Sequence, residues 1–352
     1  MGKLAAALGI GVKGSIAITL DRPTYQPGET LVGQITLRAH EDFDGKELLV
    51  TINGEEQLSW ETTRYDSLNQ HHKRRRVLVK AQHVFARSQR YRRGDYVFPF
   101  DFTLPNDLPT SFDYWESRVS DMISVHASAR YSITASLPVP GTLKSDLSNS
   151  LPVRIVAPTG DEPESLDGSD RKDNSFLGLF DNGHCTLAAS LATNQLRQKE
   201  DGTVRCRIEN NSRKRVKHVR TELVQLVELL PGDDKTHIQP QSKTRTVNRT
   251  DYFSVDAGGT RSAVLEPAMV DRDRIAVLLP SLESEFVRVS YALVVKCKYS
   301  MSEGPSVAFP LTILHSEAPR YPHEVSDHRS SRFSLDSEYN SFGLAERPYA
   351  SF

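Results

Sequence analysis

A run of basic side chains is the feature of the sequence best suited to bind a charged ligand. It begins at His71 and continues to Arg93, and no acidic residue interrupts it before Asp95. Clustered cations bind phosphate groups, either on a phosphorylated protein segment or on the headgroups of anionic lipids. The alternative, which is the more common structure for a charge run, is a solvated hairpin with charged strand faces. The residues predicted to bind phosphate or lipid are Lys73, Arg74, Arg75, Arg76, Arg90, Arg92 and Arg93.

Short motifs near the end of the sequence are candidates for recruiting other proteins. Residues 349–352 read Tyr-Ala-Ser-Phe, which fits the Y-x-x-Φ pattern bound by clathrin-adaptor subunits, so Tyr349 and Phe352 are candidate sorting-motif residues. Ser330, Ser331 and Ser334 stand beside arginines and are candidate phosphorylation sites, where each phosphate would add about two negative charges. Four-residue patterns also arise by chance, and that alternative stays open.

The other residues that could do chemistry do not form a catalytic pattern. Cys185, Cys206 and Cys297 are widely spaced, which fits neither a disulfide framework nor a zinc set and suits a reducing compartment. No nucleophile elbow or glycine-rich phosphate loop occurs, and no histidine has carboxylates or cysteines at metal-ligand spacing. A formal net charge of -1 and a pI of about 6.8 disfavour nucleic acid as a partner. We therefore expect a protein that is not an enzyme and that has no metal site or cofactor.

The elements that must position these residues are β-strands. Apolar and polar residues alternate over many short segments, so that each segment has one apolar face and one wet face. This pattern is typical of antiparallel sheets packed in pairs, and turn signals such as Pro27-Gly28 separate the segments. The sequence predicts an all-β protein of two tandem antiparallel β-sandwich domains. Representative inward-facing sets are Ile16, Ile18 and Leu20; Val77, Val79, Ala81 and Phe85; and Val287, Val289, Tyr291, Leu293, Val295 and Cys297.

Polar segments divide the chain into parts. Alternation is lost in an acidic stretch rich in proline, glycine and serine near the middle, and again near the C-terminal end. The prediction is an N-terminal extension over residues 1–14, a first sandwich over 15–157, a linker over 158–181, a second sandwich over 182–315 and a disordered tail over 316–352. No apolar stretch reaches the roughly 20 residues needed to cross a bilayer.

Several motifs within this frame resemble the arrestin family. Residues 25–33 look like the Y-x-P-G-E-x-V-x-G that opens arrestin N-domains. Residues 98–112 are close to the family's F-P-F-x-F-x-L-P-x-x-L-P-x-S-F, which is the most specific match. In the second half, residues 210–217 look like N-x-S-x-K-x-V-K. The resemblance extends over residues 15–315 and is closest to the alpha-arrestins.

The resemblance implies a protein that acts by binding. It implies a cytoplasmic adaptor, associated peripherally with the plasma membrane or endosomes, that links membrane cargo or receptors to clathrin adaptors and ubiquitin ligases. Alpha-arrestins usually recruit HECT-type ligases through P-P-x-Y motifs, whereas this sequence has only Arg320-Tyr321-Pro322 and Arg347-Pro348-Tyr349. The alternatives are a receptor-desensitising or retromer-like relative, or a structural or stress scaffold on the same fold. Residues 271–274, Asp-Arg-Asp-Arg, would suit an interdomain charge lock, but we expect them to form a solvated loop.

Overall fold

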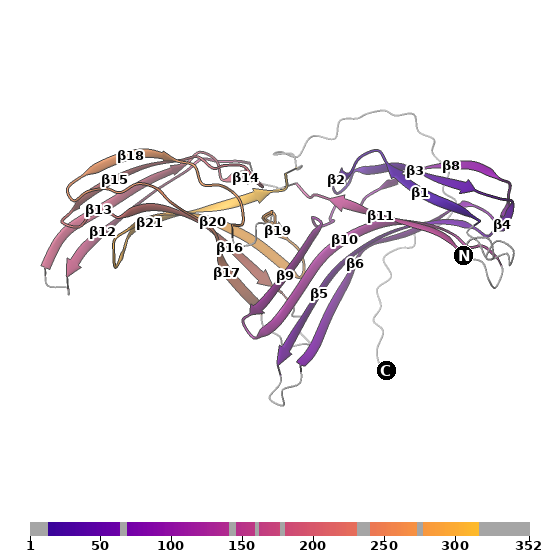
Figure 1. Cartoon of the computed structure of the whole chain (residues 1–352), viewed down its shortest axis with the longest axis horizontal. Helices are drawn as coiled ribbons and strands as arrows, with labels where there is room; N and C mark the ends of the chain where they lie inside the picture. The colour runs from indigo at the N-terminus through magenta and orange to yellow at the C-terminus, as the bar shows by residue number, and fades with distance from the viewer. Residues whose placement is uncertain are drawn as a thin grey trace, which may run out of the picture.

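The computed structural model describes residues 13–63, 69–140, 146–158, 162–176, 180–230, 240–272 and 277–316. Within these ranges every regular element is a β-strand. No helix there is long and apolar enough to cross a membrane. The prediction of an all-β chain with two tandem sandwiches is confirmed (Figure 1). The predicted tail, apart from Ser316, lies outside the described residues, as does nearly all of the predicted N-terminal extension.

The first sandwich contains strands β1 to β11. A sheet in the order β1-β3-β8 packs on a larger sheet in the order β2-β11-β10-β5-β6, with β9 paired to β10, while β4 and β7 pair with each other. Its core lies between the two larger sheets and includes Ile35, Leu37 and Ile133. The strands are β1 (Gly14–Leu20), β2 (Thr24–Tyr25), β3 (Thr30–Ala39), β4 (Phe43–Gly45), β5 (Leu48–Thr63), β6 (Asn69–Ala86), β7 (Gln89–Tyr91), β8 (Gly94–Thr103), β9 (Phe112–Val119), β10 (Met122–Leu137) and β11 (Leu147–Ile155).

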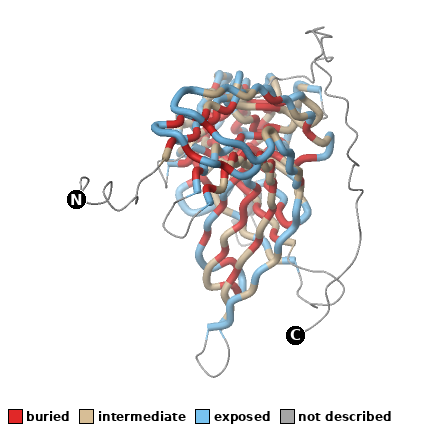
Figure 2. Tube along the Cα trace, turned by 90° about the vertical axis from the view of Figure 1, so that its right-hand side faces the viewer, coloured by how far each residue is buried: buried red, intermediate tan, exposed pale blue. Residues whose placement is uncertain are grey.

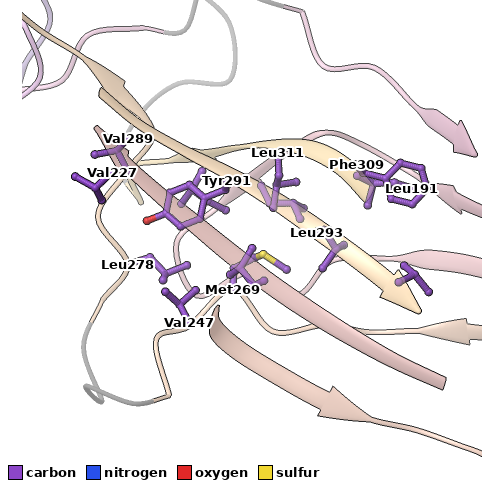
Figure 3. Close-up of a cluster of buried hydrophobic side chains, with 14 of the residues drawn as sticks. Leu191, Val227, Val247, Met269, Leu278, Val289, Tyr291, Leu293, Phe309 and Leu311 are labelled. Atoms are coloured by element: carbon purple, nitrogen blue, oxygen red, sulfur yellow. The ribbon is translucent and has the colours of Figure 1, made fainter. Parts of the chain in front are cut away.

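The second sandwich contains strands β12 to β21. A sheet in the order β12-β13-β15-β18 packs on a sheet in the order β14-β21-β20-β16-β17, with β19 paired to β20. Figure 3 shows part of its core, in which Leu191, Leu293 and Phe309 come from three different strands. The strands are β12 (Leu166–Phe176), β13 (Phe180–Leu191), β14 (Gln195–Arg197), β15 (Val204–Ser212), β16 (His218–Leu229), β17 (Gln241–Asp251), β18 (Thr260–Leu265), β19 (Leu282–Glu283), β20 (Val287–Lys298) and β21 (Glu303–Leu314).

Much of the segment predicted to be a linker is a strand. β12 occupies residues 166–176 and pairs antiparallel with β13, with Leu166 opposite Leu191. The prediction was wrong for these residues because β12 is a polar edge strand: between Leu166 and Asp173 it carries mostly Asp, Ser, Arg and Lys, and it shows no apolar alternation. Such a segment becomes a strand because it pairs with a neighbouring strand, and not because its own residues favour that conformation.

The three long strands β5, β6 and β10 extend beyond the β1-β3-β8 sheet that packs on them. The even-numbered residues of β5 from Leu48 to Trp60 all point to one face. Near Val50 and Ile52 this face is covered by the first sandwich, whereas Leu58 and Trp60 belong to the same buried cluster as the core of the second. Figure 1 shows these strands extending toward β16 and β17. In β5 buried positions alternate with intermediate ones, a pattern visible in the lower part of Figure 2. The far ends of β5, β9 and β10 therefore complete the core of the second sandwich, and this shared core joins the two domains, while the first sandwich keeps a core of its own.

A β-bulge changes the direction of side chains in the middle of β6. Gly54 pairs with Val79 and Glu55 pairs with Val77, so Leu78 is an extra residue between the two pairs. Val79 is buried, but Val77 is 55% exposed. The predicted inward orientation of Val77 was wrong because simple alternation does not allow for the extra residue.

Candidate functional site

The predicted basic residues lie at two separate places on the first sandwich. Lys73, Arg74, Arg75 and Arg76 are consecutive in β6, whereas Arg90, Arg92 and Arg93 lie in or just after β7. Because a strand advances about 3.3 Å per residue, the rest of β6 puts roughly 30 Å between the two groups. The structure therefore brings the first four residues together and places the other three elsewhere.

The four consecutive cations of β6 point alternately to the two faces of the sheet. Lys73 and Arg75 are exposed on the outer face, where Arg75 forms an ion pair with Glu55 of the neighbouring β5. Lys73 has no carboxylate partner among the described residues. This outer face is available to an anionic ligand because the second sandwich packs on the opposite face.

Arg74 and Arg76 point to the inner face and contact the second sandwich. The Arg74 guanidinium carbon lies 4.9 Å from the centre of the Phe286 ring, a cation–π contact. Arg76 Nη1 lies 3.1 Å from Glu285 Oε2. Half of the consecutive cations thus contribute to the contact between the two sandwiches, which sequence reasoning did not anticipate.

Glu56 of β5 is a buried carboxylate in the same contact. Its side chain has no exposed surface, and Oε1 accepts a hydrogen bond of 3.1 Å from the backbone N–H of Phe286. Phe286 is itself buried, and its carbonyl accepts a hydrogen bond from Leu230. A second connection forms where Lys243 of β17 donates to the carbonyls of Ser117 and Arg118 at the end of β9.

In the second basic group, the side chain of Arg90 and the backbone N–H groups of Arg92 and Arg93 make local contacts. Arg90 lies 3.6 Å from a carboxylate oxygen of Asp42, and the backbone N–H of Arg93 donates to the same side chain. The backbone N–H of Arg92 donates to the Tyr96 hydroxyl. These contacts fix the loop after β7, and they favour a structural role for its backbone.

Family comparison agrees with the fold of two tandem sandwiches. The model of the arrestin (or S-antigen) N-terminal domain matches residues 15–157, and the model of the arrestin C-terminal domain matches residues 183–318. The chain belongs to the arrestin family. Members of this family are generally binding adaptors, so the function of the chain is to be sought on its surfaces. No curated protein matched the chain in a sequence comparison.

In this arrestin-family chain a cleft of about 1180 Å³ lies between the two sandwiches. Asp271, expected in a solvated loop, is 5% exposed at its wall and accepts two hydrogen bonds from Arg245, of 3.1 and 2.5 Å. That expectation was wrong for Asp271, because its pairing with Arg245 holds it in the wall of the cleft. Arg272 is exposed, and Asp273 and Arg274 lie outside the described residues. Beside them, burial raises the pKa of Tyr291, although a hydrogen bond from Gln225 opposes the shift.

An ion-pair network on the second sandwich was missed from the sequence. Glu222 of β16 is 6% exposed, although it points away from the core side of its sheet. It lies 2.6 Å from Lys296 Nζ and 3.2 Å from Arg249 Nε. Nearby, hydrogen bonds from Arg220 lower the pKa of Asp251. The signal was present as alternating charges within β16, but only the register with β17 and β20 shows which charges meet.

Several predicted residues cannot be placed. Tyr349, Phe352, Ser330, Ser331 and Ser334 lie outside the described residues. In the part of the chain that is described, no group of three or more histidine, cysteine or acidic side chains is arranged to hold a metal ion.

Proposed function

We propose that this arrestin-family chain is a trafficking adaptor, closest to the alpha-arrestins, that links membrane cargo to endocytic or ubiquitination machinery. It acts by binding, in the cytoplasm and at the surface of the plasma membrane or endosomes. The anionic ligand is a phosphorylated cargo segment or a lipid headgroup, and Lys73 and Arg75 on the outer face of β6 bind it.

One observation carries this proposal. Lys73 and Arg75 are exposed on the side of the sheet that the second sandwich leaves uncovered, and β6 contains no acidic residue. Two adjacent outward cations can both contact one phosphate-bearing surface, because residues two apart on a strand share a face. Arg74 and Arg76 support the same surface from behind while holding the second sandwich.

The partners that would connect the adaptor to the trafficking machinery are proposed from the family alone. They are clathrin adaptors, which would bind Tyr349 and Phe352, and a HECT-type ubiquitin ligase, for which the sequence offers no P-P-x-Y motif. Phosphorylation of Ser330, Ser331 or Ser334 would add charge that the β6 cations attract.

Vesicle and peptide binding test the ligand side. Each basic residue near an anionic membrane contributes about 1 kcal/mol, so Lys73→Ala with Arg75→Ala should weaken binding to phosphatidylserine vesicles about 30-fold. The matched control is Arg171→Ala with Lys172→Ala on β12, two exposed cations of the second sandwich, which should bind like wild type. A phosphopeptide arm identifies the source of the anion. Equal binding by wild type and the β6 double variant in both arms would refute the proposal.

A further inference from the structure

The free side of β6 is an uncovered sheet edge. In the order β2-β11-β10-β5-β6 it is the terminal strand, and β5 is its only strand partner among the described residues (Figure 1). It runs from Asn69 to Ala86, far longer than the usual strand of about five to six residues. An edge of this length presents a row of backbone N–H and C=O groups to any extended chain that approaches it.

Cations flank the first half of this edge on both faces of the sheet. Lys73 and Arg75 project to the outer face, and Arg74 and Arg76 project to the inner face. A strand added beside them would direct its own side chains alternately over these two faces. Its outward acidic residues would meet Lys73 and Arg75, whereas the inner-face cations Arg74 and Arg76 already contact the second sandwich.

One carboxylate already binds on the inner face. Glu285 from the second sandwich lies 3.1 Å from Arg76, so the position accepts an acidic side chain that comes from another part of the structure. The bulge at Leu78 interrupts the edge and limits a straight added strand to residues 69–77.

A second copy of the chain fits this edge poorly. If two β6 edges paired antiparallel, the cations of one copy would face those of the other, and like charges opposite each other destabilise strand pairs. Charge complementarity thus selects an acidic partner.

From these observations we infer that β6, over residues 69–77, binds an extended acidic segment of a partner protein by strand addition. Backbone hydrogen bonds to the edge supply affinity, and carboxylates over Lys73 and Arg75 on the outer face supply selectivity. The inference rests on the proposed function, because the same cations bind the cargo. It adds that the edge of β6 also binds the backbone of the partner segment.

Fluorescein-labelled octaglutamate is a suitable probe, used with the full chain. A version N-methylated at every residue keeps the carboxylates but loses the N–H groups of both strand edges. Strand addition requires the N–H groups of one edge, so this version should bind about tenfold or more weakly than the parent. Lys73→Glu with Arg75→Glu should abolish binding of the parent probe, and Arg171→Glu with Lys172→Glu on the β12 edge should not.

The remaining outcomes distinguish failure of the inference from failure of the proposed function. Equal affinities for the parent and the methylated probe would show that only side-chain charge is recognised. Absence of octaglutamate binding, with phosphatidylserine vesicles still bound, would refute strand addition and leave the proposed function standing. Octaglutamate binding without any binding of vesicles or phosphopeptides would support strand addition and refute the proposed function. Self-association by sedimentation that Val77→Asp removes would assign the edge to a second copy.

Discussion

At the scale of single residues, the contact between Arg245 and Asp271 shows how burial changes the role of a charge. The two side chains form a bidentate pair, and Asp271 is almost completely buried while Arg245 keeps 18% of its side chain exposed. Desolvation makes such a pair costly to break, because the remaining partner cannot recover water. An exposed pair such as Arg38 with Asp95 has the same geometry at a surface where solvent replaces either partner.

This difference predicts the effect of two matched substitutions. Asp271→Asn should lower the free energy of unfolding by about 3–5 kcal/mol, because Arg245 is left near the interdomain cleft without its counterion. Asp95→Asn removes an exposed counterion and should cost about 1 kcal/mol or less. Denaturant unfolding monitored by tryptophan fluorescence measures both values. Similar losses for the two variants would contradict a structural role for the buried pair.

At the scale of strands, much of the fold could be predicted from alternation alone. Residues such as Ile16, Ile18 and Val289 point inward as expected, because a strand with one apolar face must bury it. Alternation does not say what covers that face, so it could not show that Leu58 packs against the second sandwich rather than the first.

The same limit applies to the candidate site. The basic run was visible in the sequence, but its division was not, since residues 73–76 and 90–93 are close in the chain and only a long extended strand separates them in space. The inward direction of Arg74 and Arg76 depends on the position of Phe286, which is distant in sequence. Packing decides which distant segments pair with each other, and a single sequence does not reveal that packing.

Phe286 is the clearest test of contacts between strands. It is 1% exposed and lies between Arg74 and the Glu56 carboxylate, at the turn that leads into β20. Phe286→Ala should lower the free energy of unfolding by about 3–5 kcal/mol, the usual cost of deleting a buried aromatic ring. Val264→Ala is the control, because Val264 is 56% exposed and its truncation should change stability by less than about 0.5 kcal/mol. A neutral result for Phe286→Ala would show that the turn does not hold the sandwiches together.

At the scale of the whole molecule, the two sandwiches are joined through a buried surface as well as through the chain. Leu58 and Trp60 from β5, Phe112 and Tyr114 from β9 and Val125 from β10 belong to one cluster with the second core. Fully buried Glu56 and partly exposed Lys243 add polar contacts between the two sandwiches. Sandwiches linked only by a flexible segment would unfold independently, whereas a shared core couples their unfolding.

The shared core predicts one cooperative transition for the full chain. Differential scanning calorimetry should give a single peak whose van't Hoff enthalpy equals the calorimetric enthalpy. A fragment of residues 162–316 should melt at a lower temperature and bind a hydrophobic dye, because it exposes the surface that Leu58 and Trp60 cover. Phe286→Ala should weaken the coupling and split the peak, while Val264→Ala should leave it intact. Two separate peaks for the wild-type chain, with a fragment as stable as its counterpart in the full chain, would show that the sandwiches are energetically independent despite their contact.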